Sequence, residues 1–84
     1  MSVLAFFRRT SSEQALEQFL AGVERRAYQT AILTTRREAD ALDIVQDAML
    51  QLVQHYRHQD SQEWPKLMQR ILQNRIVDWV RQQQ

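Results

Sequence analysis

The sequence contains no cysteine, and it has one glycine (Gly22) and one proline (Pro65) among its 84 residues. Without cysteine the chain forms neither a disulfide framework nor a thiolate metal site, which fits a reducing cytoplasm. Glycine and proline are the residues that most disfavour a helix interior, so their scarcity leaves long stretches of good helix formers. A chain of this length forms one domain at most. The composition therefore predicts a single small all-α domain.

The sequence also lacks a long hydrophobic run and a strong excess of one charge. The apolar run Val3–Phe7 is too short to span a membrane, and it precedes Arg8-Arg9, the reverse of the order in a secretory signal. We expect no membrane insertion. The net charge is +1, so bulk electrostatics alone would hold nucleic acid only weakly. The charges are nevertheless segregated: residues 38–55 carry four carboxylates and no Lys or Arg, whereas residues 64–84 carry four bases and one acid.

The first twelve residues show no helical period, and we predict that 1–12 form a short N-terminal arm. A first helix is predicted over about 13–33, with Ser11 or Ser12 as its N-cap. Gly22 inside this helix costs about 1 kcal/mol relative to alanine. It is either a point of close helix crossing or a tolerated exposed glycine. The predicted apolar face of this helix consists of Leu16, Phe19, Leu20, Val23 and Ala27.

A second helix is predicted over about 36–56, because Thr35-Arg36-Arg37-Glu38 matches a capping box. Its predicted apolar stripe is Leu42, Val45, Met49, Leu52, Val53 and Tyr56. A polar connection follows over 56–62, and Asp60 or Ser61 is expected to cap the third helix. The predicted apolar face of this third helix is Trp64, Leu67, Met68, Ile71, Leu72, Ile76, Trp79 and Val80.

Pro65 places the start of the third helix within a few residues, because proline is tolerated only in the first turn. The helix is expected to end near Arg81. Together, these segments predict a compact three-helix bundle over residues 13–84.

The second helix has another face that its apolar stripe does not use. Carboxylates and amides surround one apolar residue there, and the face is either a solvated acidic surface or a docking surface for a basic partner helix. Its members are Asp43, Gln46, Asp47, Leu50, Gln51 and Gln54.

The third helix carries cationic and amide side chains in one sector. Such a stripe suits phosphate and base contacts in nucleic acid, although it is equally the pattern of a solubilising face. The stripe consists of Lys66, Arg70, Gln73 and Arg81, with Asn74 at its margin.

One arginine falls inside an apolar face. Arg75 projects between Ile71 and Trp79, where an unpaired charge is unfavourable. We therefore predict an ion pair between Arg75 and a carboxylate, either Asp78 or one on the second helix. Trp79 and Trp64 are expected in the core rather than as platforms for stacked bases.

Nothing in the sequence assembles an enzyme site. His55 and His58 lack a set of convergent carboxylates that would complete a metal site, and no glycine-rich phosphate loop or nucleophile motif is present. The sequence therefore favours a binding function without a cofactor.

Two runs carry a family resemblance. Asp40-Ala41-Leu42-Asp43-Ile44-Val45-Gln46-Asp47-Ala48-Met49 resembles the D-A-x-D-[IL]-V-Q-[DE]-x-[FM] stretch of bacterial RNA polymerase sigma factors of the extracytoplasmic-function (ECF) class. Trp64–Arg75 resembles the family's F-x-x-W-L-x-x-I-A-x-N-[RK] run, and Ile76–Arg81 resembles the [LA]-[IV]-D-x-[LW]-R that follows. The chain departs from the pattern at Trp64, where the family has Phe, at Leu67, where it has Trp, and in having Pro65.

The resemblance implies a region-two sigma domain, whose acidic helix binds the coiled-coil clamp helices of the polymerase β′ subunit. The residues expected to make this contact are Asp43, Gln46, Asp47 and Leu50. It also implies that the connecting loop and third helix open and read the minus-ten promoter element and capture a base of the non-template strand. The residues expected at the DNA are Tyr56, Arg57, His58, Asp60, Ser61, Lys66, Arg70, Asn74 and Arg81.

Members of this family also carry a helical region four that reads the minus-thirty-five element, and the 84 residues do not include one. We expect either an expressed fragment or a natural single-domain protein. One alternative function is an interaction module bound mainly by an anti-sigma regulator. Another is an autonomous helix-turn-helix DNA-binding domain, which the seven-residue connection 56–62 and the acidity of the second helix disfavour.

Overall fold

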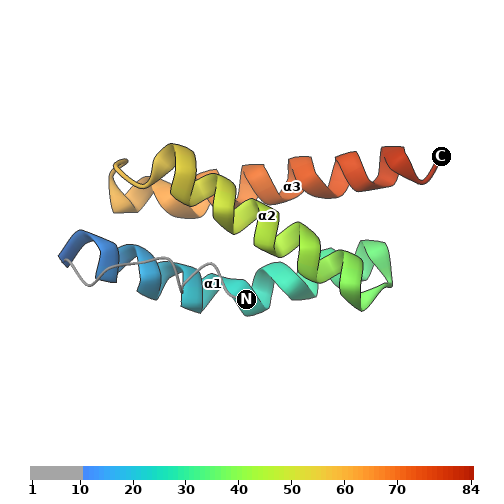
Figure 1. Ribbon diagram of the computed structural model, residues 1–84, viewed down its shortest axis with the longest axis horizontal. Coiled ribbons are helices and arrows are strands. Elements are labelled where there is room, and N and C mark those ends of the chain that lie inside the picture. Colours follow the sequence, from blue (N-terminus) through green and yellow to red (C-terminus); the bar gives the residue numbers. More distant parts are fainter. Residues whose placement is uncertain (1–10) are drawn as a thin grey trace.

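The computed structural model describes residues 11–84, and in this part of the chain it contains three α-helices and no strand. Helix α1 covers Ser11–Thr35, α2 covers Glu38–Tyr56 and α3 covers Trp64–Gln82, with the 3-10 helix η2 (Ser61–Glu63) directly before α3. In Figure 1, α1 and α3 run in the same direction and α2 returns diagonally between them. The predicted all-α three-helix architecture is confirmed.

The start of the first helix differs from the prediction. Helix α1 begins at Ser11, so the last two residues of the predicted arm are helical, and Ser11 and Ser12 lie in the first turn instead of preceding it. The rest of the predicted arm, residues 1–10, lies outside the described residues.

The core lies where the faces of all three helices meet. Alanines occupy several of its fully buried positions, which allows close approach of α1 and α2. The largest side chains with almost no exposure are Leu16, Leu20, Met49, Leu52 and Met68. Helical periodicity predicts most of this core. It is wrong for Leu42 and Val80, which are 46% and 36% exposed, while Ile44 is buried instead of Leu42.

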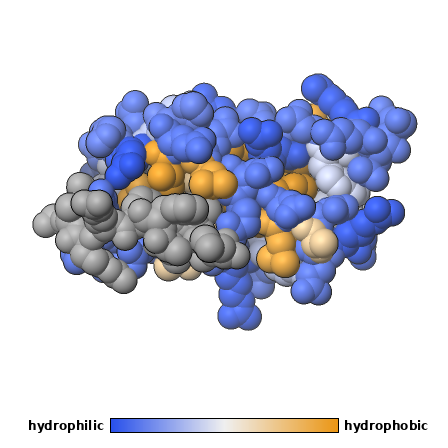
Figure 2. Space-filling view, in the orientation of Figure 1, coloured by the Kyte–Doolittle hydropathy of each residue, from blue (hydrophilic) through white to orange (hydrophobic). Residues whose placement is uncertain are grey.

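The surface outside this core is mainly hydrophilic. Figure 2 shows separate hydrophobic patches among hydrophilic residues on the part of this face that is coloured. No helix within residues 11–84 is long and apolar enough to span a membrane.

Gly22 is exposed, and a methyl group added at its Cα would have no neighbour within 4 Å. No other helix crosses close to it. Of the two interpretations of this glycine, the structure therefore supports the tolerated exposed position.

The turn between α1 and α2 lies about two residues later in the chain than the capping-box prediction placed it. Thr35 is the last residue of α1, and it is only 3% exposed. Its hydroxyl accepts from the Arg37 backbone N–H (3.3 Å) and also lies 3.2 Å from the Arg37 carbonyl oxygen, to which it can donate. The N-cap of α2 is therefore Arg37, which makes no side-chain cap, and the helix begins at Glu38. The predicted capping box does not form because its first residue belongs to the preceding helix.

Arg36 has a φ of 56°, in the left-handed region that favours glycine, and its N–H donates to the Ile32 carbonyl oxygen at 3.0 Å. We expect Arg36→Gly to raise the free energy of unfolding by about 0.5–1 kcal/mol, because it removes the Cβ clash of this conformation. Urea denaturation followed by circular dichroism measures the change. Arg36→Ala is the matched control, since it removes the guanidinium but keeps the Cβ. An equal gain from Arg36→Ala would show that charge, not backbone strain, is responsible.

Candidate functional site

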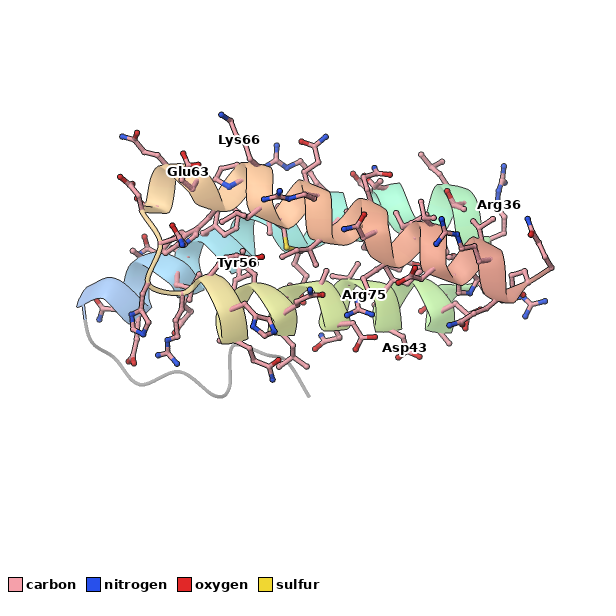
Figure 3. All side chains as sticks on the ribbon, turned by 90° about the horizontal axis from the view of Figure 1, so that it is seen from above. Arg36, Asp43, Tyr56, Glu63, Lys66 and Arg75 are labelled. Atoms are coloured by element: carbon pink, nitrogen blue, oxygen red, sulfur yellow. The ribbon has the colours of Figure 1, made fainter. Side chains whose placement is uncertain are left out.

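The outward face of α2 presents the predicted acidic surface. Asp43 and Asp47 are exposed, and Gln46 and Leu50 are half-buried. Leu50 packs its inner side against the core while leaving part of its side chain at the surface. In Figure 3, Asp43 points away from the bundle, on the edge opposite Lys66. The four residues expected to bind a partner therefore lie together on one accessible face, which we call the acidic face.

A polar cleft of about 470 Å³ lies between α2 and the C-terminal half of α3, and Asp43 and Asp47 of the acidic face form part of its lining. The indole Nε1–H of Trp79 donates to Oδ2 of Asp40 across one end of it, at 3.1 Å. Nearby, the guanidinium of Arg75 donates to Oε1 of Gln51 through Nη2 (2.9 Å) and Nε (3.3 Å). These contacts tie α3 to α2 and fix the rotation of the acidic face relative to α3.

The predicted ion pair of Arg75 requires a correction. Its hydrogen-bond partner is the amide of Gln51 on α2 and not a carboxylate, and Asp78 is exposed on α3. An amide partner is enough to stabilise the charge of Arg75 for two physical reasons. Arg75 is only half-buried, so water still solvates part of its charge, and an amide oxygen has two lone pairs to accept both N–H groups.

The basic and amide stripe of α3 is exposed, with the apolar Val77 between Asn74 and Arg81. Its members lie on the side of α3 that faces away from the core, and the stripe contains no carboxylate. They are Lys66, Arg70, Gln73, Asn74 and Arg81, which we call the α3 stripe. The structure thus brings these five residues together on one exposed side of the helix.

The connection between α2 and α3 is held by hydrogen bonds to backbone groups and by a buried aromatic side chain. The Tyr56 carbonyl oxygen accepts from the Gln59 backbone N–H (3.0 Å) and from the Trp64 indole N–H (3.2 Å). The Asp60 carboxylate accepts from the Gln62 N–H at 3.0 Å and caps η2, whereas the N-cap of α3 itself is Glu63, which makes no side-chain cap, so the predicted cap lies one short helix earlier. Trp64 is only 4% exposed and lies against the Phe19 ring, with centroids 5.8 Å apart. Trp64 therefore anchors the whole segment to the core.

Residues of this segment predicted at DNA divide into two groups. Arg57 donates to Oε1 of Glu13 on α1 at 3.0 Å, and Asp60 serves as the cap, so both already have contacts within the domain. His58 and Ser61 are exposed, and Tyr56 is half-buried at the end of α2. Of the residues predicted at DNA, His58, Ser61 and Tyr56 are therefore the ones in this segment whose side chains are not used in these contacts.

Sequence reasoning misses the polar contacts between helices. Asp40 belongs to a family motif and Trp79 to a predicted apolar face, yet they form a hydrogen bond across 39 positions of sequence. Gln51 belongs to the predicted outer face, and it binds Arg75. No periodicity could reveal these pairs, because they depend on how α2 and α3 are rotated against each other. Among the described residues, no group of three or more metal-binding side chains converges.

Comparisons with known proteins agree with this arrangement. The sequence matches the sigma-70 region 2 family over residues 15–84, which is most of the chain. No curated protein and no solved structure gives a match. Sigma-70 region 2 is a domain of sigma factors, which act in transcription initiation and promoter recognition, and it is not an enzyme family. With the family pattern running from α1 through α3, this chain belongs to the sigma-70 region 2 family.

Proposed function

We propose that this domain docks on core RNA polymerase through its acidic face and thereby brings the α3 stripe and the connecting segment to the minus-ten element of a promoter. The supporting observation is the separation of charge between two exposed surfaces. Asp43 lies on one edge of the bundle, and Lys66 lies on the opposite edge (Figure 3). Asp47 is exposed one helical turn after Asp43. One domain can therefore contact a basic protein helix and a nucleic acid at once, without either partner covering the other's surface.

The proposed polymerase contact is with the clamp helices of the β′ subunit. Asp43 and Asp47 supply charge, Gln46 supplies an amide, and Leu50 supplies the apolar centre of the contact. Because Asp40 and Gln51 are held by α3, the acidic face keeps a fixed orientation toward the α3 stripe. Docking would thus determine where the promoter lies.

The proposed promoter contact has two parts. The α3 stripe holds the phosphate backbone, with Asn74 at its margin placed for base readout. His58, Ser61 and Tyr56 border the place where an unstacked base of the non-template strand would be held. Membership of the ECF class and a cytoplasmic location belong to the same proposal.

The decisive experiment measures whether promoter binding depends on polymerase. Fluorescence anisotropy of a labelled single-stranded minus-ten oligonucleotide is recorded with the chain alone, with core polymerase alone and with both. Because the chain has a net charge of only +1, we expect tight, sequence-dependent binding only when both are present. Equally tight binding of duplex DNA by the chain alone would instead indicate an autonomous DNA-binding domain.

Within that complex, Lys66→Gln and Asn74→Ala should have different effects. Lys66→Gln should weaken binding of all oligonucleotides and reduce the slope of log affinity against log salt by about 0.7, the value for one phosphate contact on a single strand. Asn74→Ala should instead reduce discrimination between the minus-ten sequence and a scrambled one. If Asn74→Ala leaves that discrimination unchanged, Asn74 does not read a base.

The alternative in which an anti-sigma regulator is the main partner involves the same surfaces. A regulator that covers the acidic face would compete with the clamp helices, so Asp47→Arg would weaken both contacts. Copurification of a small helical protein that blocks polymerase binding would favour this alternative.

A further inference from the structure

The side of the bundle away from α2 has a groove of about 300 Å³ between α1 and α3. Its floor is apolar and consists of Phe19, Val23 and Ala27 from α1 and Met68 and Leu72 from α3. Helices α1 and α3 touch each other less than either touches α2, so the residues from 11 to 84 leave the third side of the bundle open. Gln73 at its edge also belongs to the α3 stripe, whereas the other lining residues play no part in the proposed polymerase or promoter contacts.

The length of this groove matches a short helix. On α1 it extends from Phe19 to Thr30, a rise of roughly 17 Å or three turns. A helix of about 11–14 residues covers that distance with apolar side chains at i, i+3 or i+4, and i+7, the spacing by which amphipathic helices enter grooves. Such a helix would complete a four-helix arrangement around the existing core.

The charges around the groove indicate the chemistry of that helix. Among the described residues that line it, Arg26 is the one charged side chain and none is a carboxylate. Lys66 is exposed directly after Pro65, which lines the opposite wall, and adds a second cation near the rim. Glu13 of α1, by contrast, contacts Arg57 beside α2.

Asp40 and Asp78 likewise line the cleft on the other side of α3. The groove therefore combines an apolar floor with polar walls, with Arg26 on the α1 wall and Lys66 near the α3 rim. A nucleic-acid backbone matches only the walls, whereas a helix with an apolar stripe flanked by carboxylates matches both.

We propose that the α1–α3 groove is a docking site for an amphipathic helix of a partner protein, with apolar anchors on the floor and Asp or Glu side chains against Arg26 and Lys66. The probe is a designed 14-residue helical peptide, fluorescein-labelled, with leucines at the spacing above and glutamates on both flanks. A second peptide carries lysines in place of the glutamates. Anisotropy titrations with the full 84-residue chain compare the two.

We expect the glutamate peptide to bind about tenfold more tightly than the lysine peptide, because two cations face its flanks. Arg26→Glu should remove or reverse this preference. Arg26 is exposed, so its replacement should leave the fold intact. Arg37→Glu is the matched charge reversal outside the groove, on the lining of the other cleft, and should leave the preference unchanged.

Filling the groove tests the site itself. Thr30→Trp and Gln69→Trp place a large ring on the α1 wall and the α3 wall, at positions that are exposed. Each variant that keeps the helical circular dichroism spectrum should lose binding of the glutamate peptide. The proposal is overturned if both folded variants bind normally.

Two other outcomes would assign the groove to a different occupant and would also overturn the proposal. The first is a concentration-dependent dimer in sedimentation that both groove-filling variants abolish, which would make a second copy of this chain the occupant. The second is loss of oligonucleotide binding with unchanged peptide binding in Arg26→Glu, which would make nucleic acid the ligand.

Discussion

Replacing Trp64 with alanine is expected to lower the free energy of unfolding by about 3–5 kcal/mol, the range for truncating a buried aromatic side chain. The ring is 4% exposed and lies against Phe19, so its removal leaves a cavity between α1 and α3. The total stability of a domain this small is on the order of 4–12 kcal/mol. We therefore expect a large unfolded fraction at 37 °C, measured by thermal and urea denaturation.

Two controls separate the contributions of Trp64. Trp64→Phe keeps a ring against Phe19 and loses the indole N–H, and it should cost about 1 kcal/mol or less, because the Tyr56 carbonyl oxygen still accepts from Gln59. Trp79→Ala removes a half-buried ring of the same size and should cost clearly less than Trp64→Ala. If the two alanine variants lost equal stability, the assignment of Trp64 as the main anchor of the connecting segment would be wrong.

Replacing Asp47 with arginine is expected to weaken binding to a β′ clamp-helix fragment by roughly 30-fold or more, because charge reversal turns an attraction into a repulsion from a basic partner. Asp47 is exposed on the acidic face, so the substitution leaves the core untouched. The affinity of the unaltered chain should fall as salt is raised, since exposed charges are screened. Pull-down and anisotropy with the purified fragment measure both effects.

The matched control for this variant is Glu63→Arg, which reverses an exposed acid at the start of α3, on the edge opposite Asp43 in Figure 3. It should bind the clamp-helix fragment like the unaltered chain. Undiminished binding by Asp47→Arg would remove the basis for placing polymerase on the acidic face. Equal loss in both variants would show that only the overall charge matters.

Some of the structural features behind these predictions can be predicted from the sequence, and others cannot. The existence of three helices follows from the apolar spacing and from the near absence of glycine and proline. The acidic face and the α3 stripe follow too, because each lies on a single helix and periodicity alone determines which residues share a face. The sequence resemblance and the match to sigma-70 region 2 concern the same segments.

The helix ends are predicted less well. Thr35 looks like an N-cap in sequence, but its burial places it in α1, and Arg36 then adopts a left-handed conformation to reverse the chain. The exposure of Leu42 has a similar cause. A leucine at the margin of an apolar stripe is buried or exposed according to the position of the neighbouring helix, which its own helix does not encode.

The sequence by itself thus determined the helices, the faces within each helix and the separation of acidic from basic segments, since all of these follow from local spacing. Tertiary structure alone decided that Arg75 binds Gln51 instead of a carboxylate and that Asp40 binds Trp79. It also decided that α1 and α3 leave an open groove. The physical reason is that contacts between helices depend on their relative rotation, register and crossing angle, which are determined by the packing of the whole core.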